Sequence, residues 1–148
     1  MVDRAKRDIL AEKLRHLLSG RIDNLQFDTL DEGDVLNSED RVLREVFQSM
    51  WFFYDDFRSH PIRLTDGQRL DFVRAILFLH SDLEFEWPSR RNLPQGIFHW
   101  LVNVFALTRT SSKPPIQPVK GDRGVFPFYR RSDYECALKN PRLLVGAT

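Results

Sequence analysis

Glycine and proline divide this chain into segments whose apolar residues recur every three or four positions. The clearest segment runs from Ser38 to Phe57 and is followed by His60-Pro61. Apolar residues at this spacing line one face of an α-helix, and the residue before a proline avoids the helical conformation. The pattern returns along most of the 148 residues. We therefore predict a mainly α protein, a single compact domain of four to five helices with a long irregular C-terminal segment.

Capping signals mark the ends of these helices. Gly20 follows the first apolar stripe, at a point where helices commonly end in a left-handed residue. Thr65 and Gln68 have the spacing of a capping box, and Ser132 and Glu135 repeat it. The expected helices are 3–19, a short helix capped by Asp23 or Asn24, 38–57, 66–80, 94–108 and about 133–138.

These helices divide the domain into three parts. Residues 1–36 are expected to form a helical hairpin, 38–109 to hold the central helices, and 110–148 to form a loop-rich basic segment. The helices 38–57 and 94–107 carry the widest apolar faces, so we expect them at the centre of the core.

Further core predictions follow from which positions are apolar. Arg7 falls among the charged positions of the first helix and is expected in solvent. The apolar side of helix 66–80 is expected to hold Leu70, Val73, Ile76, Leu77 and Phe78. Residues 81–88 alternate between polar and apolar and are interpreted as an extended connection. Aromatic lids over the core are expected from Leu83, Phe85 and Trp87 and from Phe126, Phe128 and Tyr129.

Several classes of protein are disfavoured by the composition. Cys136 is the one cysteine, so no disulfide can form within the chain and no cysteine-based zinc site can be built. The charged N-terminus lacks the apolar core of a signal peptide, and no apolar stretch approaches the roughly 20 residues of a membrane span. We expect a cytoplasmic protein without a membrane partner and without a cofactor.

Charge is distributed unevenly along the chain. From Asp23 to Asp40 there are acidic residues and no lysine or arginine. Such an acidic face can bind a basic protein partner and accelerate the encounter. The predicted partner-binding residues are Asp23, Asp28, Asp31, Glu32, Asp34, Glu39 and Asp40.

Two other sites remain open as alternatives. His80, Asp82, Glu84 and Glu86 would share one face of an extended segment and offer ligands for a metal-dependent hydrolase. Tyr129, Arg130 and Arg131 combine an aromatic ring with basic residues in the C-terminal third, as weak nucleic-acid binders do. Nucleic acid is the less favoured partner, because a sequence pI of 7.9 is low for a protein of that class.

Four segments resemble a family of small bacterial proteins of unknown function. They are LRHLLSGRIDNLQF (14–27), VF with WFFYDD (46–56), FLHSDLEFEWP (78–88) and PFYRRSDYE (127–135). The resemblance covers most of the chain and implies no activity. In size, helix content and acidic patches the chain also looks like toxin-neutralising immunity proteins. We therefore predict a protein-binding module without catalysis, an immunity-type or regulatory inhibitor that uses its acidic face.

Overall fold

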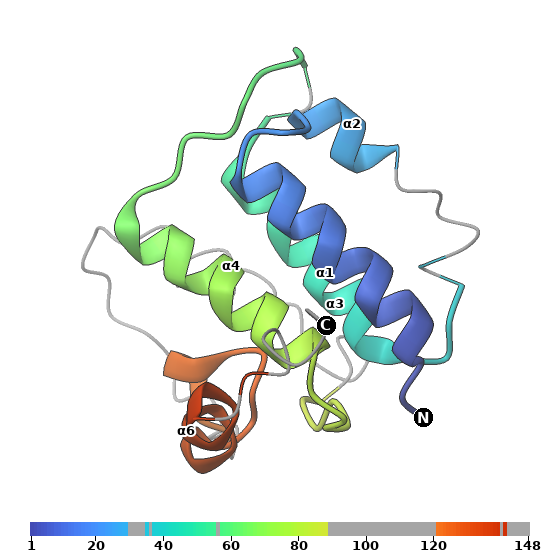
Figure 1. Ribbon diagram of the computed structural model, residues 1–148, viewed down its shortest axis with the longest axis vertical. Coiled ribbons are helices and arrows are strands. Elements are labelled where there is room, and N and C mark those ends of the chain that lie inside the picture. The colour runs from blue at the N-terminus through green and yellow to red at the C-terminus, as the bar shows by residue number, and fades with distance from the viewer. Residues whose placement is uncertain (30–34, 36, 56, 89–120, 140, 142–148) are drawn as a thin grey trace, which may run out of the picture.

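The computed structural model describes residues 1–29, 35, 37–55, 57–88, 121–139 and 141. This part of the protein is mainly helical and contains no strand (Figure 1). None of the helices in these ranges combines the length and apolar character that a membrane span requires. The α-helices are α1 (Arg4–Leu18), α2 (Asn24–Asp28), α3 (Arg41–Met50), α4 (Asp66–Leu79) and α6 (Arg131–Lys139), and the short 3-10 helices are η2 (Trp51–Phe53) and η4 (Arg123–Val125).

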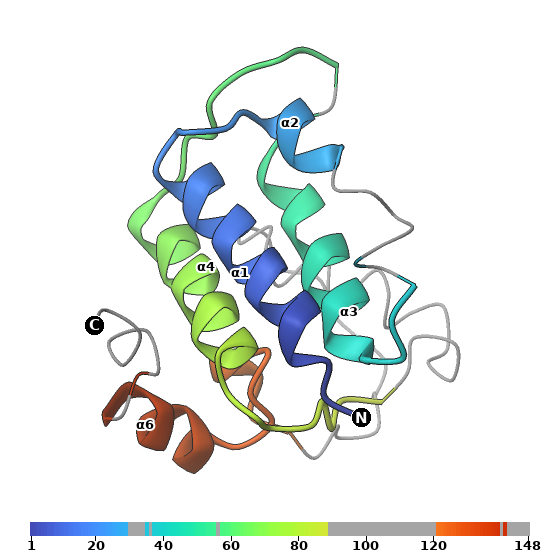
Figure 2. The same cartoon turned by 45° about the vertical axis from the view of Figure 1, so that its right-hand side comes forward.

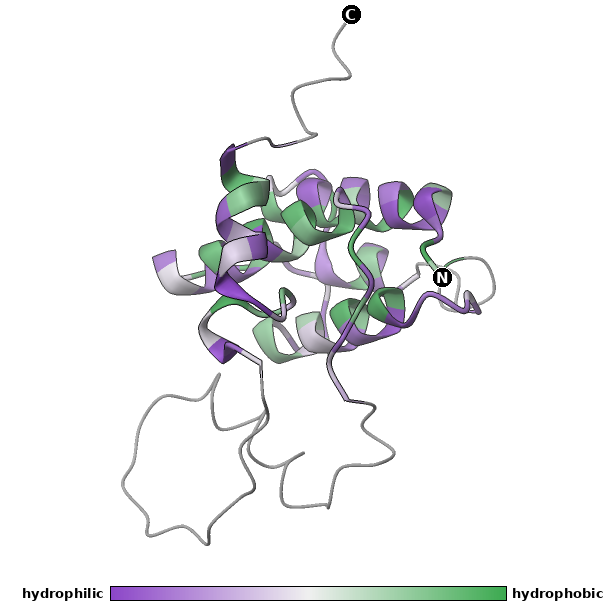
Figure 3. Cartoon of the chain, turned by 90° about the horizontal axis from the view of Figure 1, so that it is seen from below, coloured by the Kyte–Doolittle hydropathy of each residue, from purple (hydrophilic) through white to green (hydrophobic). Residues whose placement is uncertain are grey.

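The helix α1 lies between α3 and α4 (Figure 2) and contacts both. It runs parallel to α3 and antiparallel to α4. The short α2 lies across one end of this layer, and α6 packs against the opposite end, beside the last turns of α4. Figure 3 shows apolar and polar residues alternating along these helices, as expected for helices that bury one face.

The connection from α1 to α2 forms as its sequence predicts. Gly20 adopts a φ of 71°, the left-handed conformation expected after a helix. Asp23, rather than Asn24, caps α2, and together with Gln26 it forms a capping box. Asn24 is instead fully buried: its Nδ2 donates to the carbonyls of Asp55 and Arg58. This side chain fixes the connection between α3 and α4 against α2.

The central helix is shorter than predicted at both ends. The structure has α3 at Arg41–Met50, not 38–57, and Asp40 rather than Ser38 precedes it. After Met50 the chain continues as the 3-10 helix η2 and becomes extended at Tyr54. Four consecutive aromatic residues cannot all lie on one face of a continuous helix. The change from α-helix to 3-10 helix allows Phe53 to enter the core while Trp51 stays exposed.

The boundaries of α4 are confirmed, and part of its predicted apolar face is wrong. Thr65 and Gln68 form the capping box, and His80 ends the helix. Leu70 and Val73 are exposed, whereas Phe72 and Ala75 are buried with residues 76–79. The buried face is therefore rotated relative to the predicted one, toward α1 and the end of α3.

The two predicted aromatic lids meet each other and pack against α4, whereas one of the two helices that they were expected to cover, 94–107, lies outside the described residues. Residues 82–86 form neither helix nor strand. The Phe85 and Trp87 rings contact Phe126, and the Trp87 indole N–H donates to the Pro127 carbonyl at 2.9 Å. Phe128 is fully buried against Phe78.

Two further expectations concern the C-terminal half. The helix α6 begins at Arg131, so Ser132 lies inside it and does not cap it as predicted. The predicted helix 94–108, with its proposed central place in the core, lies outside the described residues.

Arg7 is the largest departure from the predicted polar face of α1, because it is fully buried. Its Nε lies 2.6 Å from Asp40 Oδ2, and its Nη2 lies 3.1 Å from Oδ1. Its Nη1 donates to the carbonyls of Ser81 and Leu83, each at 2.9 Å. The guanidinium therefore joins α1, the start of α3 and the chain beyond α4.

Candidate functional site

Two of the predicted partner-binding acids lie at opposite ends of α2, where Asp23 caps its start and Asp28 is its last residue. Asp23 Oδ1 accepts a hydrogen bond from Gln26 N at 2.7 Å, and its Oδ2 accepts one from the Ser59 hydroxyl at 2.6 Å. The bonds from Ser59 and Gln26 lower the pKa of Asp23 below its ordinary value of 3.8. Asp28 accepts a hydrogen bond from the Tyr54 hydroxyl at 2.7 Å. These contacts fix both carboxylates in place.

The other predicted acids do not join that pair. Asp40 is buried and neutralises Arg7, so it is an internal residue and not part of a binding face as predicted. Glu39 is exposed, but it precedes α3. The ten residues of α3 separate its two ends by about 15 Å. Asp31, Glu32 and Asp34 lie outside the described residues.

An exposed aromatic pair, Trp51 and Phe52, follows α3. The exposed fractions of Trp51 and Phe52 are 53% and 39%. The Trp51 ring meets the edge of Phe47 at 6.0 Å, and Phe47 stacks on Phe27 of α2 at 5.3 Å. The ring of Phe27 also contacts Tyr54 at 6.3 Å, whose hydroxyl bonds Asp28. This row of rings passes through the core, where Phe47 and Phe27 are buried, and connects Trp51 with Asp28 at the end of α2.

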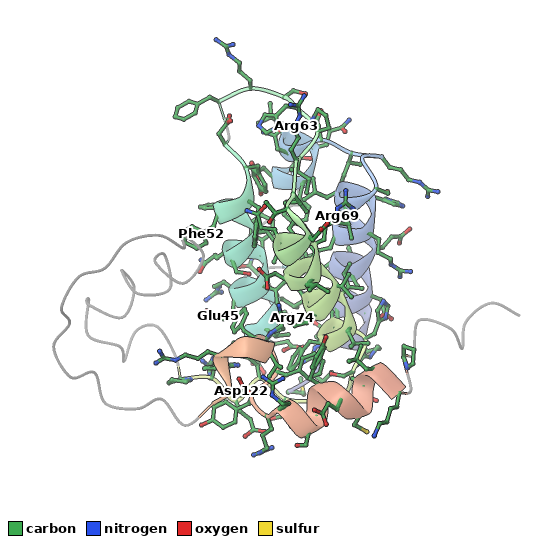
Figure 4. The ribbon with its side chains drawn as sticks, turned by 90° about the vertical axis from the view of Figure 1, so that its left-hand side faces the viewer. Glu45, Phe52, Arg63, Arg69, Arg74 and Asp122 are labelled. Atoms are coloured by element: carbon green, nitrogen blue, oxygen red, sulfur yellow. The ribbon has the colours of Figure 1, made fainter. Side chains whose placement is uncertain are left out.

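A cavity of about 550 Å³ lies between the end of α3, the first three turns of α4 and the segment 123–127. Figure 4 shows this face, with Arg74 on α4, Asp122 near the segment that closes one end, and Phe52 projecting from the end of α3. The cavity is large enough for a small molecule or a partner's side chains. Its lining residues are Ser49, Met50, Phe53, Thr65, Gly67, Gln68, Asp71, Arg74, Ala75, Arg123, Gly124, Phe126 and Pro127.

The charged groups of the cavity are Asp71, Arg74 and Arg123. Burial raises the pKa of Asp71, and the nearby Arg74 opposes this rise only in part. Arg74 Nη2 lies 2.9 Å from Asp71 Oδ1, while its Nη1 donates to the Gly124 carbonyl. Burial also lowers the pKa of Arg123. The cavity thus removes water from charged groups of both signs.

The predicted metal ligands each interact with a different charged group, the three acids with cations and His80 with a carboxylate. Asp82 lies 2.6 Å from Arg4, and Glu86 lies 2.7 Å from Arg130. His80 Nδ1 approaches Asp8 at 3.5 Å, and Glu84 approaches the N-terminal amine at 3.5 Å. Within the described ranges, no group of three or more histidine, cysteine, aspartate or glutamate residues is close enough to hold a metal ion. The structure therefore does not bring these four side chains together.

The predicted nucleic-acid residues are occupied by contacts within the protein. Both Nη atoms of Arg130 bond Glu86, at 2.8 and 2.7 Å. Arg131 Nε donates to Asp122 at 2.9 Å, and the Tyr129 ring packs against Trp87. Two carboxylates therefore neutralise the two guanidinium groups that would have met phosphates.

The cavity and the buried Arg7 were missed from sequence. Asp71 and Arg74 are three residues apart on a helix, which ordinarily indicates a solvent-exposed ion pair. The cavity combines segments from three distant parts of the chain, and no local pattern marks such a meeting. Trp51 falls inside the predicted apolar stripe, so its exposure was not foreseen; the only available signal was that four consecutive aromatic residues exceed what one helix face can bury.

None of the family models, curated proteins or solved structures compared with the chain matches it. The resemblance to small bacterial proteins therefore stays an expectation from sequence.

Proposed function

We propose that this protein is a cytosolic protein-binding module without catalysis, of the regulatory or immunity type. Its partner would contact the surface formed by Asp23, Asp28, Trp51 and Phe52, which we call the α2–η2 surface. The partner is expected to present basic groups around an apolar patch. The placement in the cytosol rests on the single cysteine, which suits a reducing compartment.

The observation that carries this proposal is the exposure of Trp51, whose ring is connected through Phe47, Phe27 and Tyr54 to the fixed carboxylate of Asp28. A half-exposed tryptophan leaves a large apolar area in contact with water. Tryptophan and other aromatic residues are enriched at the centres of protein interfaces, where truncation commonly costs most. The ring contact with Phe47 holds Trp51 in position before a partner arrives, which reduces the entropy lost on binding.

Asp23 and Asp28 give the proposed surface a negative charge. Ser59 and Gln26 hold the Asp23 carboxylate in its ionised form, because they lower its pKa. Charges at the rim of an interface mainly increase the rate of association and exclude like-charged partners. We therefore expect binding to weaken as salt is added, since exposed charges are screened beyond about 8–10 Å at physiological ionic strength.

The experiment is affinity capture from the native lysate at low and high salt, with wild-type and variant baits. Trp51→Ser removes the exposed ring, and Asp28→Asn removes a charge but keeps an acceptor for the Tyr54 hydroxyl. Once a stoichiometric partner is identified, its Kd is measured with each purified variant. We expect Trp51→Ser to weaken binding at least about tenfold, and Asp28→Asn to reduce the association rate and its salt dependence.

Matched control variants lie on α6, at the other end of the molecule. Leu138→Ser changes an exposed apolar residue, and Glu135→Gln removes an exposed charge. Both should leave the Kd unchanged. The proposal is wrong if no partner is captured at either salt concentration, or if a captured partner responds equally to the variants on α6 and on the α2–η2 surface.

A further inference from the structure

The cavity between α3 and α4 has rigid apolar walls. Met50 and Ala75 are buried, and the Phe53 ring is held by Phe72 at 5.2 Å. On the opposite side, the Phe126 ring is held by Phe85 and Trp87. These neighbours fix the walls before anything enters. A flat apolar group would therefore gain contact area without the cost of ordering the walls.

The carboxylate of Asp71 in this cavity can accept a further hydrogen bond. Asp71 Oδ1 is paired with Arg74, but none of the described residues donates a hydrogen bond to Asp71 Oδ2. The Asp71 side chain is 25% exposed, so water reaches it only in part. A half-buried carboxylate short of donors gains more from a new hydrogen bond than a fully exposed one does.

The ion pair of the lining favours a neutral donor. Arg74 already pairs with Asp71 Oδ1, so these two charges offset each other. An ammonium or guanidinium group would gain from Asp71 but would be repelled by Arg74. A carboxylate has no hydrogen to donate to the open oxygen of Asp71. A hydroxyl or an indole N–H satisfies the open oxygen and carries no net charge into the cavity.

We infer that this cavity receives an aromatic side chain with a donor at its tip, the phenol of a tyrosine or the indole of a tryptophan, which donates to Asp71 Oδ2. The inference rests on the proposed function, because the partner protein would supply this side chain. Met50 and Phe53 line the cavity and flank the exposed Trp51 and Phe52 in sequence, so a partner that contacts Trp51 and Phe52 would lie near the cavity. Tyrosine and tryptophan combine an apolar body with one polar tip, as this lining requires.

The test uses small probes and needs no partner. Amide chemical shifts of the full chain are followed while para-cresol, para-methylanisole or toluene is added. Para-cresol carries the phenolic donor, para-methylanisole keeps the oxygen but cannot donate, and toluene lacks the oxygen. We expect para-cresol to bind at least about tenfold more tightly than the other two, with shifts centred on Met50, Ala75 and Gly124.

A pair of variants assigns this preference to one carboxylate. Asp71→Leu should abolish the advantage of para-cresol and leave toluene binding unchanged or stronger. Asp66→Leu makes the same change in the first turn of α4, outside the cavity, and should preserve the advantage. Because the comparison of the three probes uses the wild-type chain, it stands even if Asp71→Leu does not fold.

The inference is overturned if the three probes bind equally, if the shifts lie elsewhere, or if no probe binds in the millimolar range. Such a failure leaves the proposed function standing when Trp51→Ser still releases the partner. Conversely, para-cresol could bind at Asp71 while Trp51→Ser leaves partner binding unchanged. That result would support the cavity site and contradict the proposed α2–η2 surface.

Discussion

Arg7 lies on the predicted polar face of α1 but is buried in the folded protein. Its guanidinium is fully buried, and Asp40 and two backbone carbonyls bond it. It also lies over the Phe78 ring, 5.4 Å from the centroid. Taking a cation out of water is costly unless every donor is satisfied. The neighbouring Arg4 bonds the Leu79 carbonyl and Asp82, so the two arginines together bond the end of α4 and the chain that follows it.

We therefore predict that breaking this pair is more damaging than removing it. Arg7→Met should lower the free energy of unfolding by about 3–5 kcal/mol, because it leaves Asp40 charged and buried. The double variant Arg7→Met/Asp40→Leu should recover part of that loss. Urea unfolding of the two single variants and the double variant measures the coupling. A cost below about 1 kcal/mol for Arg7→Met would mean that Asp40 reaches water.

The raised pKa of Asp71 predicts a stability that depends on pH. Because burial raises this pKa above the ordinary 3.8, the folded protein holds the proton more tightly than the unfolded chain. This group's contribution to stability is therefore full below pH 3.8 and falls as the pH rises through the folded pKa. Asp71→Asn should raise the melting temperature at pH 7, and the gain should vanish by about pH 3.8. A variant that melts lower than wild type at pH 7 would show that the Arg74 ion pair outweighs the burial.

At the scale of elements, sequence reasoning located helices better than it oriented them. The caps at Asp23 and Thr65 and the turn at Gly20 were predictable, because capping depends on residues close in sequence. The early end of α3 and the rotated face of α4 were not, since both depend on which neighbour covers each side. For the same reason the sequence could indicate the acids of α2 as partner-binding residues. The exposure of Trp51 and the presence of the cavity depend on tertiary packing and could be found only from the structure.

The backbone at Gly121 lies very close to the rings of Trp87 and Tyr129. A Cβ added at Gly121 would lie 2.8 Å from the Trp87 and Tyr129 rings, whereas one added at Gly67 in α4 would meet nothing within 4 Å. We expect Gly121→Ala to destabilise the protein by about 1–3 kcal/mol, because the ring packing must open. Gly67→Ala should stabilise it by up to about 1 kcal/mol through helix propensity. Thermal melts of the two variants check this contrast, and equal effects at the two glycines would contradict it.

For the whole molecule, the packing predicts an uneven stability. The helix α1 has five buried residues, including Leu10, Leu14 and Leu17, and contacts three other helices. None of the residues of α6 is buried, and among its contacts are the Phe128–Tyr134 ring pair and exposed ion pairs such as Arg131–Asp122. Exposed ion pairs contribute about 0–1 kcal/mol each. We predict that α6 opens without global unfolding.

Native-state hydrogen exchange measures this difference directly. Amides of α6 should exchange with a free energy of opening clearly below that of α1, and added salt should lower it further. Amides of α1 should exchange only near the free energy of global unfolding. Equal protection of the two helices would show that α6 belongs to the same cooperative unit as α1.

The hydrogen bonds of Arg7 also affect when α1 can pack against the rest of the protein during synthesis. Arg7 leaves the ribosome early, but its most distant acceptor, the Leu83 carbonyl, follows 76 residues later. Until then Arg7 can pair with Asp40, but its Nη1 lacks the carbonyls of Ser81 and Leu83. Contacts so far apart in sequence also form slowly. Nascent chains stalled before Leu83 emerges should leave α1 open to protease, and chains stalled after Trp87 emerges should begin to protect it. We therefore expect Arg7 to delay the packing of α1 until the chain beyond α4 has been made.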